Sequence, residues 1–308
     1  MSETVHFARV AVVGTGLLGG SLALAIRERG LAREVVAVVR REQARREVVV
    51  LGIADRAERE LAAGVRGADL VVLASPVEAM RGLVAQLAPH LGAGAIVTDV
   101  GSVKGPLAES LPALLPAGVT YVGSHPMAGS HQTGYAHARA DLFVNAACIV
   151  TPARPANPAA EERVLWLWRA LGARVLRRSA ARHDEEVAWV SHAPHALAFA
   201  FAAALADAPA SARELAGPGF RDCTRIAGSD PAMWADILVS NKQALAGPLL
   251  AAAERAAALA RAIESGDAAA VTKLLFSARA QLAAGETLAR SGGAIPETTA
   301  AKSAAPKE

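Results

Sequence analysis

Short aliphatic runs alternate with longer segments of helical periodicity over the first half of the chain. The aliphatic runs are rich in valine, as in strands that are buried on both faces; they lie at 10–13, 35–39, 70–74, 95–100, 121–124, 147–150 and 174–176. Helical segments separate them, among them 40–51 and 161–171. Such alternation is typical of right-handed βαβ units. The pattern therefore predicts an α/β fold with a doubly wound, mainly parallel sheet over residues 1–179.

From about residue 180 onward the pattern is helical only. Apolar, alanine-rich helical periodicity recurs at 182–205, 232–245, 248–265 and 267–288, with Asp267 expected as an N-cap. We predict an all-α domain over residues 180–290. So small a unit would leave much apolar surface exposed, so we expect it to form a homodimer. The tail 291–308 is rich in Ala, Pro, Thr, Lys and Glu and is predicted to be disordered.

Composition narrows the class of protein. The chain has 308 residues, which favours two domains, and its net charge is only +3 with basic and acidic residues interleaved. No nucleic-acid partner is therefore expected.

Cys148 and Cys223 have no metal-ligand spacing, so we expect no metal site, and so few cysteines suggest a reducing compartment. Neither a signal peptide nor a membrane span is indicated, so a cytoplasmic protein without a membrane partner is predicted.

A glycine cluster, GTGLLGGS at 14–21, follows the first predicted strand and precedes a helical segment. Its first glycine permits a tight turn, its second lets the backbone approach a pyrophosphate, and its third lets the helix pack close to the strand. The helix N-terminus then faces the anion. This arrangement predicts a Rossmann-type dinucleotide-binding domain; a glycine-rich turn without a ligand is the alternative. The expected cofactor contacts are Gly14, Gly16, Leu17, Leu18, Gly19, Ser75 and Pro76.

The end of the second predicted strand bears on the choice of cofactor. A carboxylate there binds the ribose 2′-hydroxyl of NAD, whereas an arginine accommodates the 2′-phosphate of NADP. Here Arg40 and Arg41 follow the strand, and no Asp or Glu terminates it. We therefore expect contacts from both arginines and NADP favoured over NAD. In the alternative interpretation the arginines only begin a solvated helix, and Glu42 binds the ribose.

Two polar segments come directly after predicted strands, where doubly wound sheets bind their ligands. They are TDVGSVKG at 98–105 and GSHPMAGS at 123–130. His125 lies in the second, beside a proline and near glycines. An imidazole with an ordinary pKa near 6.5 suits proton abstraction at neutral pH. The alternative is a loop histidine that makes only a structural hydrogen bond.

The helical half contains a third polar group. His192 and His195 lie at i and i+3 on one side of a helix. Arg225 follows in a largely apolar helical stretch, where we expect it to be buried and to need an anion. That anion is either a ligand carboxylate or Asp222, three residues earlier.

Taken together, these segments resemble the prephenate/arogenate (cyclohexadienyl) dehydrogenase family. The resemblance extends from about residue 8 to residue 285, and the motifs GTGLLGGS, DVGSVKG, GSHPMAGS, SHAPH and GFRDCTRIAGSDPAMW occur in the family's order. It implies oxidative decarboxylation of prephenate to 4-hydroxyphenylpyruvate, or of arogenate to tyrosine, with hydride transfer to NAD(P) in tyrosine biosynthesis. Aromatisation drives such a reaction, so the protein mainly orients groups.

The resemblance also implies a role for each site residue. His125 accepts a hydrogen bond, and in effect the proton, from the substrate ring hydroxyl, and Ser102 hydrogen-bonds the same hydroxyl. Arg225 pairs with a substrate carboxylate. His195 contacts the substrate or orients its neighbours, and Ser130 lines the pocket.

One position departs from the family pattern. Many members have an acidic residue directly after the position of Ser130, whereas this chain has His131, which we include among the substrate contacts. A carboxylate there would favour the ammonium group of arogenate, so His131 favours prephenate or the use of both substrates. Trp234 is expected to pack in the core; closing the pocket or packing at the dimer contact are the alternatives.

Two other functions compete with this one. The first is a hydroxyacid or imino-acid dehydrogenase of related two-domain fold, but such enzymes commonly use a helix lysine as base, and the lysines near these motifs are only Lys104 and Lys242. The second is a non-catalytic NADP-binding sensor, which would have no reason to place His125, Ser102, His195 and Arg225 together in one cleft.

Overall fold

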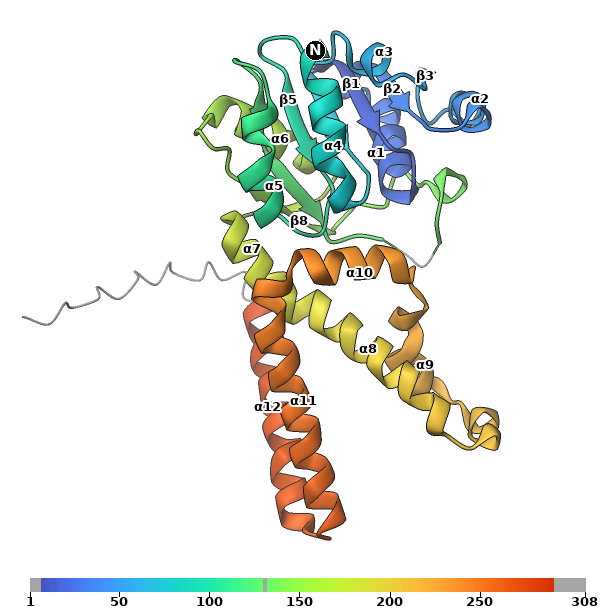
Figure 1. Cartoon of the computed structure of the whole chain (residues 1–308), viewed down its shortest axis with the longest axis vertical. Coiled ribbons are helices and arrows are strands. Elements are labelled where there is room, and N and C mark those ends of the chain that lie inside the picture. The colour runs from blue at the N-terminus through green and yellow to red at the C-terminus, as the bar shows by residue number, and fades with distance from the viewer. Residues whose placement is uncertain (1–6, 130–131, 291–308) are drawn as a thin grey trace, which may run out of the picture. The chain divides into compact units, whose positions relative to one another are not determined.

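The computed structural model describes residues 7–129 and 132–290, with side chains to residue 284. Ser130, His131 and the predicted disordered tail therefore lie outside the described residues. A parallel six-stranded sheet forms the centre of the first half (Figure 1), and its strand order is β3-β2-β1-β4-β5-β6. The strands are β1 (Phe7–Val13), β2 (Ala32–Val38), β3 (Arg56–Glu58), β4 (Leu70–Leu73), β5 (Ile96–Asp99) and β6 (Thr120–Tyr121). This order is typical of dinucleotide-binding domains and confirms the predicted doubly wound sheet.

Helices cover both faces of this sheet. They are α1 (Leu17–Glu28), α2 (Glu42–Val50), α3 (Leu61–Val65), α4 (Val77–Leu87), α5 (Gly105–Ser110) and α6 (Pro158–Ala170). Alternate residues of β1 point to opposite faces: Val10 and Val12 pack in one buried cluster with residues of α1 and α6, and Ala11 and Val13 in another with residues of α3, α4 and α5. Both faces of the strand are thus apolar, which explains its uninterrupted hydrophobic run.

A second sheet takes up strands that the sequence placed in the first. In it β7 (Gly123–Pro126) pairs antiparallel with β8 (Ala147–Thr151), and β8 pairs parallel with β9 (Arg174–Arg177). The predicted single strand 121–124 is therefore wrong, because the chain passes from β6 to β7 at Val122. A Cβ on Gly123 would lie 2.4 Å from the Thr151 hydroxyl oxygen, so glycine permits the new pairing. The strand β3 was not predicted, because it has only three residues and no apolar run.

The second half is helical, as predicted, but its boundaries differ. A π-helical turn, Ala188–His192, divides the predicted helix 182–205 into α7 (Ala180–Val187) and α8 (Ala193–Ala204). Later helices are α9 (Pro218–Thr224), α10 (Pro231–Ser240), α11 (Lys242–Glu264) and α12 (Ala268–Arg290). The predicted break near 246 lies instead at Asn241, whose buried side chain bonds to α7 and the π turn, and α11 continues through Pro248. Asp267 caps α12 as predicted, accepting from the backbone N–H of Ala270 at 2.9 Å.

The chain divides into two compact units, residues 1–249 and 250–308, with the boundary inside α11. In the second unit none of the residues from 250 to 284 is buried. One stretch, 180–207, is long enough to span a membrane and contains an 18-residue window with a mean hydropathy of 1.2, of which 28% is buried. Core helices of soluble proteins share those properties, so the stretch is weak evidence of a membrane span.

Candidate active site

The glycine loop has the geometry that dinucleotide binding requires. Gly14 has a φ of +96°, and a Cβ there would lie 2.5 Å from the Ala74 carbonyl oxygen. A Cβ on Gly19 would lie 2.0 Å from the Gly14 carbonyl oxygen, so only glycine lets α1 pack this close to the loop. A Cβ on Gly16 would meet nothing within 4 Å, so the backbone there is open to a ligand. The residues therefore fit a pyrophosphate at the N-terminus of α1.

The neighbouring predicted contacts lie at the same edge. Leu17 and Leu18 form the first turn of α1 and are half-buried. Ser75 and Pro76 follow β4, and the Ser75 backbone nitrogen would lie 3.6 Å from a Cβ on Gly14. These residues all lie at the carboxyl ends of adjacent strands, where such sheets bind ligands.

Arg40 and Arg41 are exposed beyond β2, next to the N-terminus of α2. Glu42 contacts two other arginines: Arg45 in a bidentate pair with its closest approach at 2.8 Å, and Arg46 at 3.3 Å. Chiefly the hydrogen bonds from Arg45 lower the pKa of Glu42 to about 2. Glu42, which the alternative interpretation assigns to the ribose, is therefore already occupied by arginine partners.

A buried polar network lies beneath the turn that follows β5. Asp99 forms an ion pair with the fully buried Lys104, accepts from the Tyr121 hydroxyl at 2.9 Å and accepts from the backbone N–H of Gly101 at 2.9 Å. The Ser124 backbone N–H also donates to Asp99, at 3.2 Å. Since buried charges are retained only when paired and hydrogen-bonded, this network fixes the turn containing Ser102 against β7. Ser102 itself is half-buried, and its hydroxyl has no hydrogen-bond partner among the described residues.

His125 is the buried end of a chain of three side chains. Its Nδ1 lies 2.8 Å from Nε2 of His183, and Nδ1 of His183 lies 2.7 Å from Oδ1 of Asp184. Asp184 also accepts from the backbone N–H groups of Lys104 and Gly105, each at 2.8 Å. Burial lowers the pKa of His125 well below its ordinary value, and the positive charge of Lys104 lowers it further. His125 is therefore neutral at pH 7 and able to accept a proton.

The histidines of the helical half lie around Trp234. The His195 ring stacks on Trp234 with centroids 3.6 Å apart, and the His192 ring meets the same indole edge-on at 6.1 Å. Nδ1 of His195 lies 2.9 Å from the Ser191 carbonyl oxygen, so it carries the proton and Nε2 is free to accept. Burial lowers the pKa of His195, and the nearby charge of Arg225 also lowers it. Trp234 is buried, as predicted for a core residue.

Arg225 is not the buried residue that the sequence predicted. It is exposed and begins a 3-10 turn, Arg225–Gly228, after the seven-residue helix α9, which has no buried residue. The expected burial was wrong because α9 is too short, and too little covered, to enclose a side chain. No ion pair joins Arg225 to Asp222 within the part of the chain that the structure describes.

Three site residues were not predicted from the sequence: His183, Asp184 and Asn241. His183 and Asp184 stand in the charged run RHDEE, which is typical of a solvated helix start. The only sequence signal for their burial is their spacing from the apolar Val187, because all three residues lie on the buried side of α7. Asn241 Nδ2 lies 3.0 Å from the Asp184 carbonyl oxygen and 2.9 Å from Nδ1 of His192, contacts that only the folded chain brings together.

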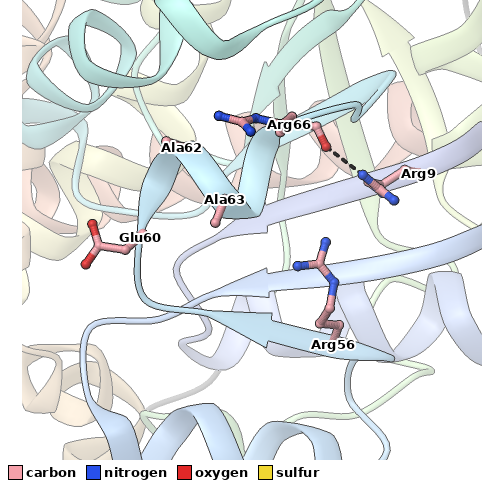
Figure 2. Close-up of a pocket in the computed structure, with 6 residues that line it drawn as sticks. All are labelled: Arg9, Arg56, Glu60, Ala62, Ala63 and Arg66. Atoms are coloured by element: carbon pink, nitrogen blue, oxygen red, sulfur yellow. Dashed lines mark hydrogen bonds between the residues drawn. The ribbon is translucent and has the colours of Figure 1, made fainter.

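A pocket of about 500 Å³ lies elsewhere, near the other end of β1 (Figure 2). Three arginines line part of it, but Arg9 and Arg56 both pair with Glu34, at 2.5 and 3.2 Å, and Arg9 also donates to the Arg66 carbonyl at 2.6 Å. Glu60 adds a further carboxylate to its lining. The pocket contains none of the predicted site residues, and its charges are largely neutralised.

Two family models match the chain. One is described as the nucleotide-binding domain of prephenate dehydrogenase and matches residues 22–177, and the other as its dimerization domain and matches residues 179–277. A prephenate dehydrogenase of Bacillus subtilis is 36% identical over 239 residues, which are 76% of this chain and 64% of that relative. The chain thus spans less than two thirds of that relative's length.

Solved structures show the same similarity. Aquifex aeolicus prephenate dehydrogenase, in complex with hydroxyphenyl propionate and NAD+, is 30% identical with a TM-score of 0.82, covering 91% of this chain and 98% of its own. Synechocystis arogenate dehydrogenase is also 30% identical, with a TM-score of 0.75, covering 89% of this chain and 98% of its own.

Proposed function

Because the chain belongs to the prephenate dehydrogenase family, we propose that it oxidatively decarboxylates prephenate, arogenate or both, and so serves tyrosine biosynthesis. The observation that carries the proposal is His125, a neutral, buried imidazole on β7. It directly follows Ser124, whose backbone N–H donates to Asp99 beneath the Ser102 turn. The named relatives act on these two substrates, and the chain has the acid–base group that the chemistry requires.

The proposed reaction removes a hydride from the ring carbon that bears the hydroxyl and carbon dioxide from the opposite ring carbon. The bound nicotinamide supplies the hydride acceptor. The electron pair of the broken carbon–carboxylate bond enters the ring, which becomes aromatic. The hydroxyl remains as the phenol, so His125 accepts its hydrogen bond as hydride leaves, and the proton returns to the phenol oxygen with no net proton change at that group.

Other residues hold the substrate. Ser102 hydrogen-bonds the ring hydroxyl, which its unpartnered side chain allows. Exposed Arg225, next to His195, binds a substrate carboxylate, and Nε2 of His195 accepts from the substrate. From the family motif we also propose Ser130 and His131 as substrate contacts, and His131 would favour prephenate because it offers no carboxylate to the ammonium of arogenate.

The proposed chemistry is tested by reduction of nicotinamide, followed by absorbance, with prephenate or arogenate against NAD or NADP. We expect the absorbance of reduced nicotinamide to increase with at least one combination of substrate and cofactor. His125→Ala should lower kcat by about 10²–10⁴-fold and leave nucleotide binding nearly intact. Unchanged turnover in this variant would remove His125 from the mechanism. A flat trace in all four combinations, from folded protein that binds nucleotide, would instead favour a hydroxyacid dehydrogenase or a sensor.

For the cofactor, we propose that NADP is favoured over NAD. The exposed side chains of Arg40 and Arg41 offer cations for a 2′-phosphate, and Glu42 is occupied by Arg45 and Arg46. Replacing Arg40 and Arg41 together with alanine should weaken NADP binding about 10- to 100-fold, since charge-assisted hydrogen bonds contribute roughly 1.5–3 kcal/mol. NAD binding should change little. Arg33→Ala, exposed near the opposite end of β2, is the matched control, and equal loss for both nucleotides would contradict the proposal.

We also propose that the chain forms a homodimer through its helical half. The match to a dimerization domain supports this, and so does the second unit, in which α12 has no buried residue between 268 and 284. Helices are stabilised mainly by burying an apolar face against a partner, so these segments need one.

A further inference from the structure

We propose that His183 and Asp184 are positioning residues that hold the proton of His125 on Nδ1, so that Nε2 is the atom that accepts from the substrate hydroxyl. Asp184 in addition anchors the turn that carries Ser102. The inference rests on the proposed function for its kinetic part only, because the position of a proton on His125 is measurable without substrate.

Asp184 is the fixed end of the hydrogen-bonded series His125–His183–Asp184. Its two oxygens take three donors: the backbone N–H groups of Lys104 and Gly105 and the ring of His183. Burial raises the pKa of Asp184, but these hydrogen bonds outweigh burial and lower it, so the carboxyl is ionised. An ionised carboxylate only accepts, and therefore Nδ1 of His183 must carry a hydrogen.

The proton positions of the two rings follow from this. Burial lowers the pKa of His183, so its ring is neutral and its Nε2 carries no hydrogen. That nitrogen faces Nδ1 of His125 at 2.8 Å, and a contact this short between two ring nitrogens needs one hydrogen. Nδ1 of His125 must therefore donate. Because His125 is neutral as well, its Nε2 is left with a lone pair.

The same carboxylate shapes the neighbouring turn. A Cβ on Gly105 would lie 2.8 Å from Oδ2 of Asp184, so glycine at this position lets the carboxylate reach the backbone. The two anchored N–H groups come two and three residues after Ser102. Asp184 thus ties the Ser102 turn and the His125 ring to one point on α7.

Asn241 holds that point in place. It donates to the Asp184 carbonyl oxygen at 3.0 Å, and its side chain lies 2.9 Å from His192 in the π-helical turn. Since α7 lies in the segment matched by the dimerization-domain model, a residue of the helical half sets the proton of a histidine in the nucleotide-binding half. Neither half alone would supply the complete base.

The first test is a 15N imidazole spectrum of the full-length protein without substrate. We expect wild-type His125 to show a protonated Nδ1 and an unprotonated Nε2. In Asp184→Asn the amide can donate to Nδ1 of His183. The tautomers of both histidine rings then reverse, and the hydrogen of His125 lies on Nε2. The matched control is Glu186→Gln on the same helix, which breaks outward-facing ion pairs with Arg178 and Arg182 and should leave the spectrum unchanged. A wild-type His125 protonated on Nε2 overturns the inference.

The second test separates positioning from structure by kinetics. Asp184→Asn should lower kcat about 10²–10⁴-fold, the range for loss of a general base, with little change in nucleotide affinity. If this variant does not fold, His183 provides the comparison. His183→Gln restores an acceptor for Nδ1 of His125 and should retain at least tenfold more activity than His183→Phe, which fills the space but accepts nothing.

Equal activity of the two His183 variants, in folded protein, would overturn the positioning role. The two tests distinguish failure of the proposed function from failure of the positioning role. A wild-type protein that turns over neither substrate, yet shows His125 protonated on Nδ1, refutes the proposed function alone. Turnover with His125 protonated on Nε2 refutes the positioning role alone.

Discussion

At the scale of single residues, the candidate site is an arrangement of buried polar groups that satisfy one another. Asp99, Lys104, Asp184 and His183 are all buried, and each has a charged or hydrogen-bonding partner within the site. A buried group without such a partner would cost roughly 1–3 kcal/mol, more if charged. The partners therefore hold the side chains in fixed positions and set their protonation states.

The lowered pKa of His125 predicts the pH dependence of the reaction. Because burial disfavours the charged imidazole, the base stays unprotonated until the pH falls well below 6.5. The value of kcat/KM should therefore be flat at neutral pH, and its decline on the acid side should begin below the ordinary histidine pKa. A pH series of initial rates with saturating nucleotide checks this. An acid limb centred at or above 6.5 would contradict the proposed environment of His125.

At the scale of elements, the glycines in the link from β1 to α1 serve two different purposes, ligand binding and helix packing. Both Gly16 and Gly19 belong to the loop-and-helix motif, but their surroundings differ. The position of a Cβ on Gly16 is open, whereas one on Gly19 would overlap the Gly14 carbonyl and lie 2.8 Å from the Ala74 Cβ. One glycine therefore serves the ligand and the other serves the packing of the helix on the strand.

This difference predicts opposite effects for two similar substitutions. Gly16→Ala should leave the thermal unfolding midpoint within a few degrees and weaken nucleotide binding about tenfold or more, a loss of about 1.4 kcal/mol or more. Gly19→Ala should destabilise the protein by about 1–3 kcal/mol or more, because α1 must move away from the loop. Thermal unfolding and nucleotide titration of both variants check the pair. Equal destabilisation by both would contradict the distinction.

At the scale of the whole molecule, burial is unevenly distributed. The sheet domain has two buried clusters, one on each face. The described part of the second unit has none, although Leu250, Ile263, Leu275 and Phe276 are large and apolar there. Apolar surface of this extent is expected to be covered by another chain.

A second copy of this chain is the expected cover. Wild-type protein should have about twice the 31.6 kDa mass of one chain in light scattering. Replacing Leu275 and Phe276 together with glutamate should give a monomer with a lower unfolding midpoint, since burying these charges at an interface is unfavourable. Val50→Glu, exposed on α2 in the sheet domain, is the control and should remain dimeric. A monomeric wild type would refute the homodimer.

Much of the fold was determined by the sequence alone, because its information is local. The valine-rich runs predicted β1, β2, β4 and β5, and the glycine spacing predicted the turn from β1 to α1, since strand burial and a positive φ both act within a few residues. His125 and Ser102 were predicted as site residues because each comes soon after a predicted strand, although His125 itself lies within β7. The doubly wound topology follows from the same alternation of strands and helices.

Only the tertiary structure decided how distant residues meet. It separated β6 from β7 at Val122 through the pairing of β7 with β8. It left Arg225 exposed because little covers α9, and it moved the break between α10 and α11 to Asn241, which bonds to α7 and the π turn. Above all it brought His183 and Asp184, nearly 60 residues after His125, into the chain of hydrogen bonds. From a sequence alone, charged residues at the start of a helix are interpreted as exposed to solvent. Whether their side chains face water or a buried histidine depends on what packs against the helix.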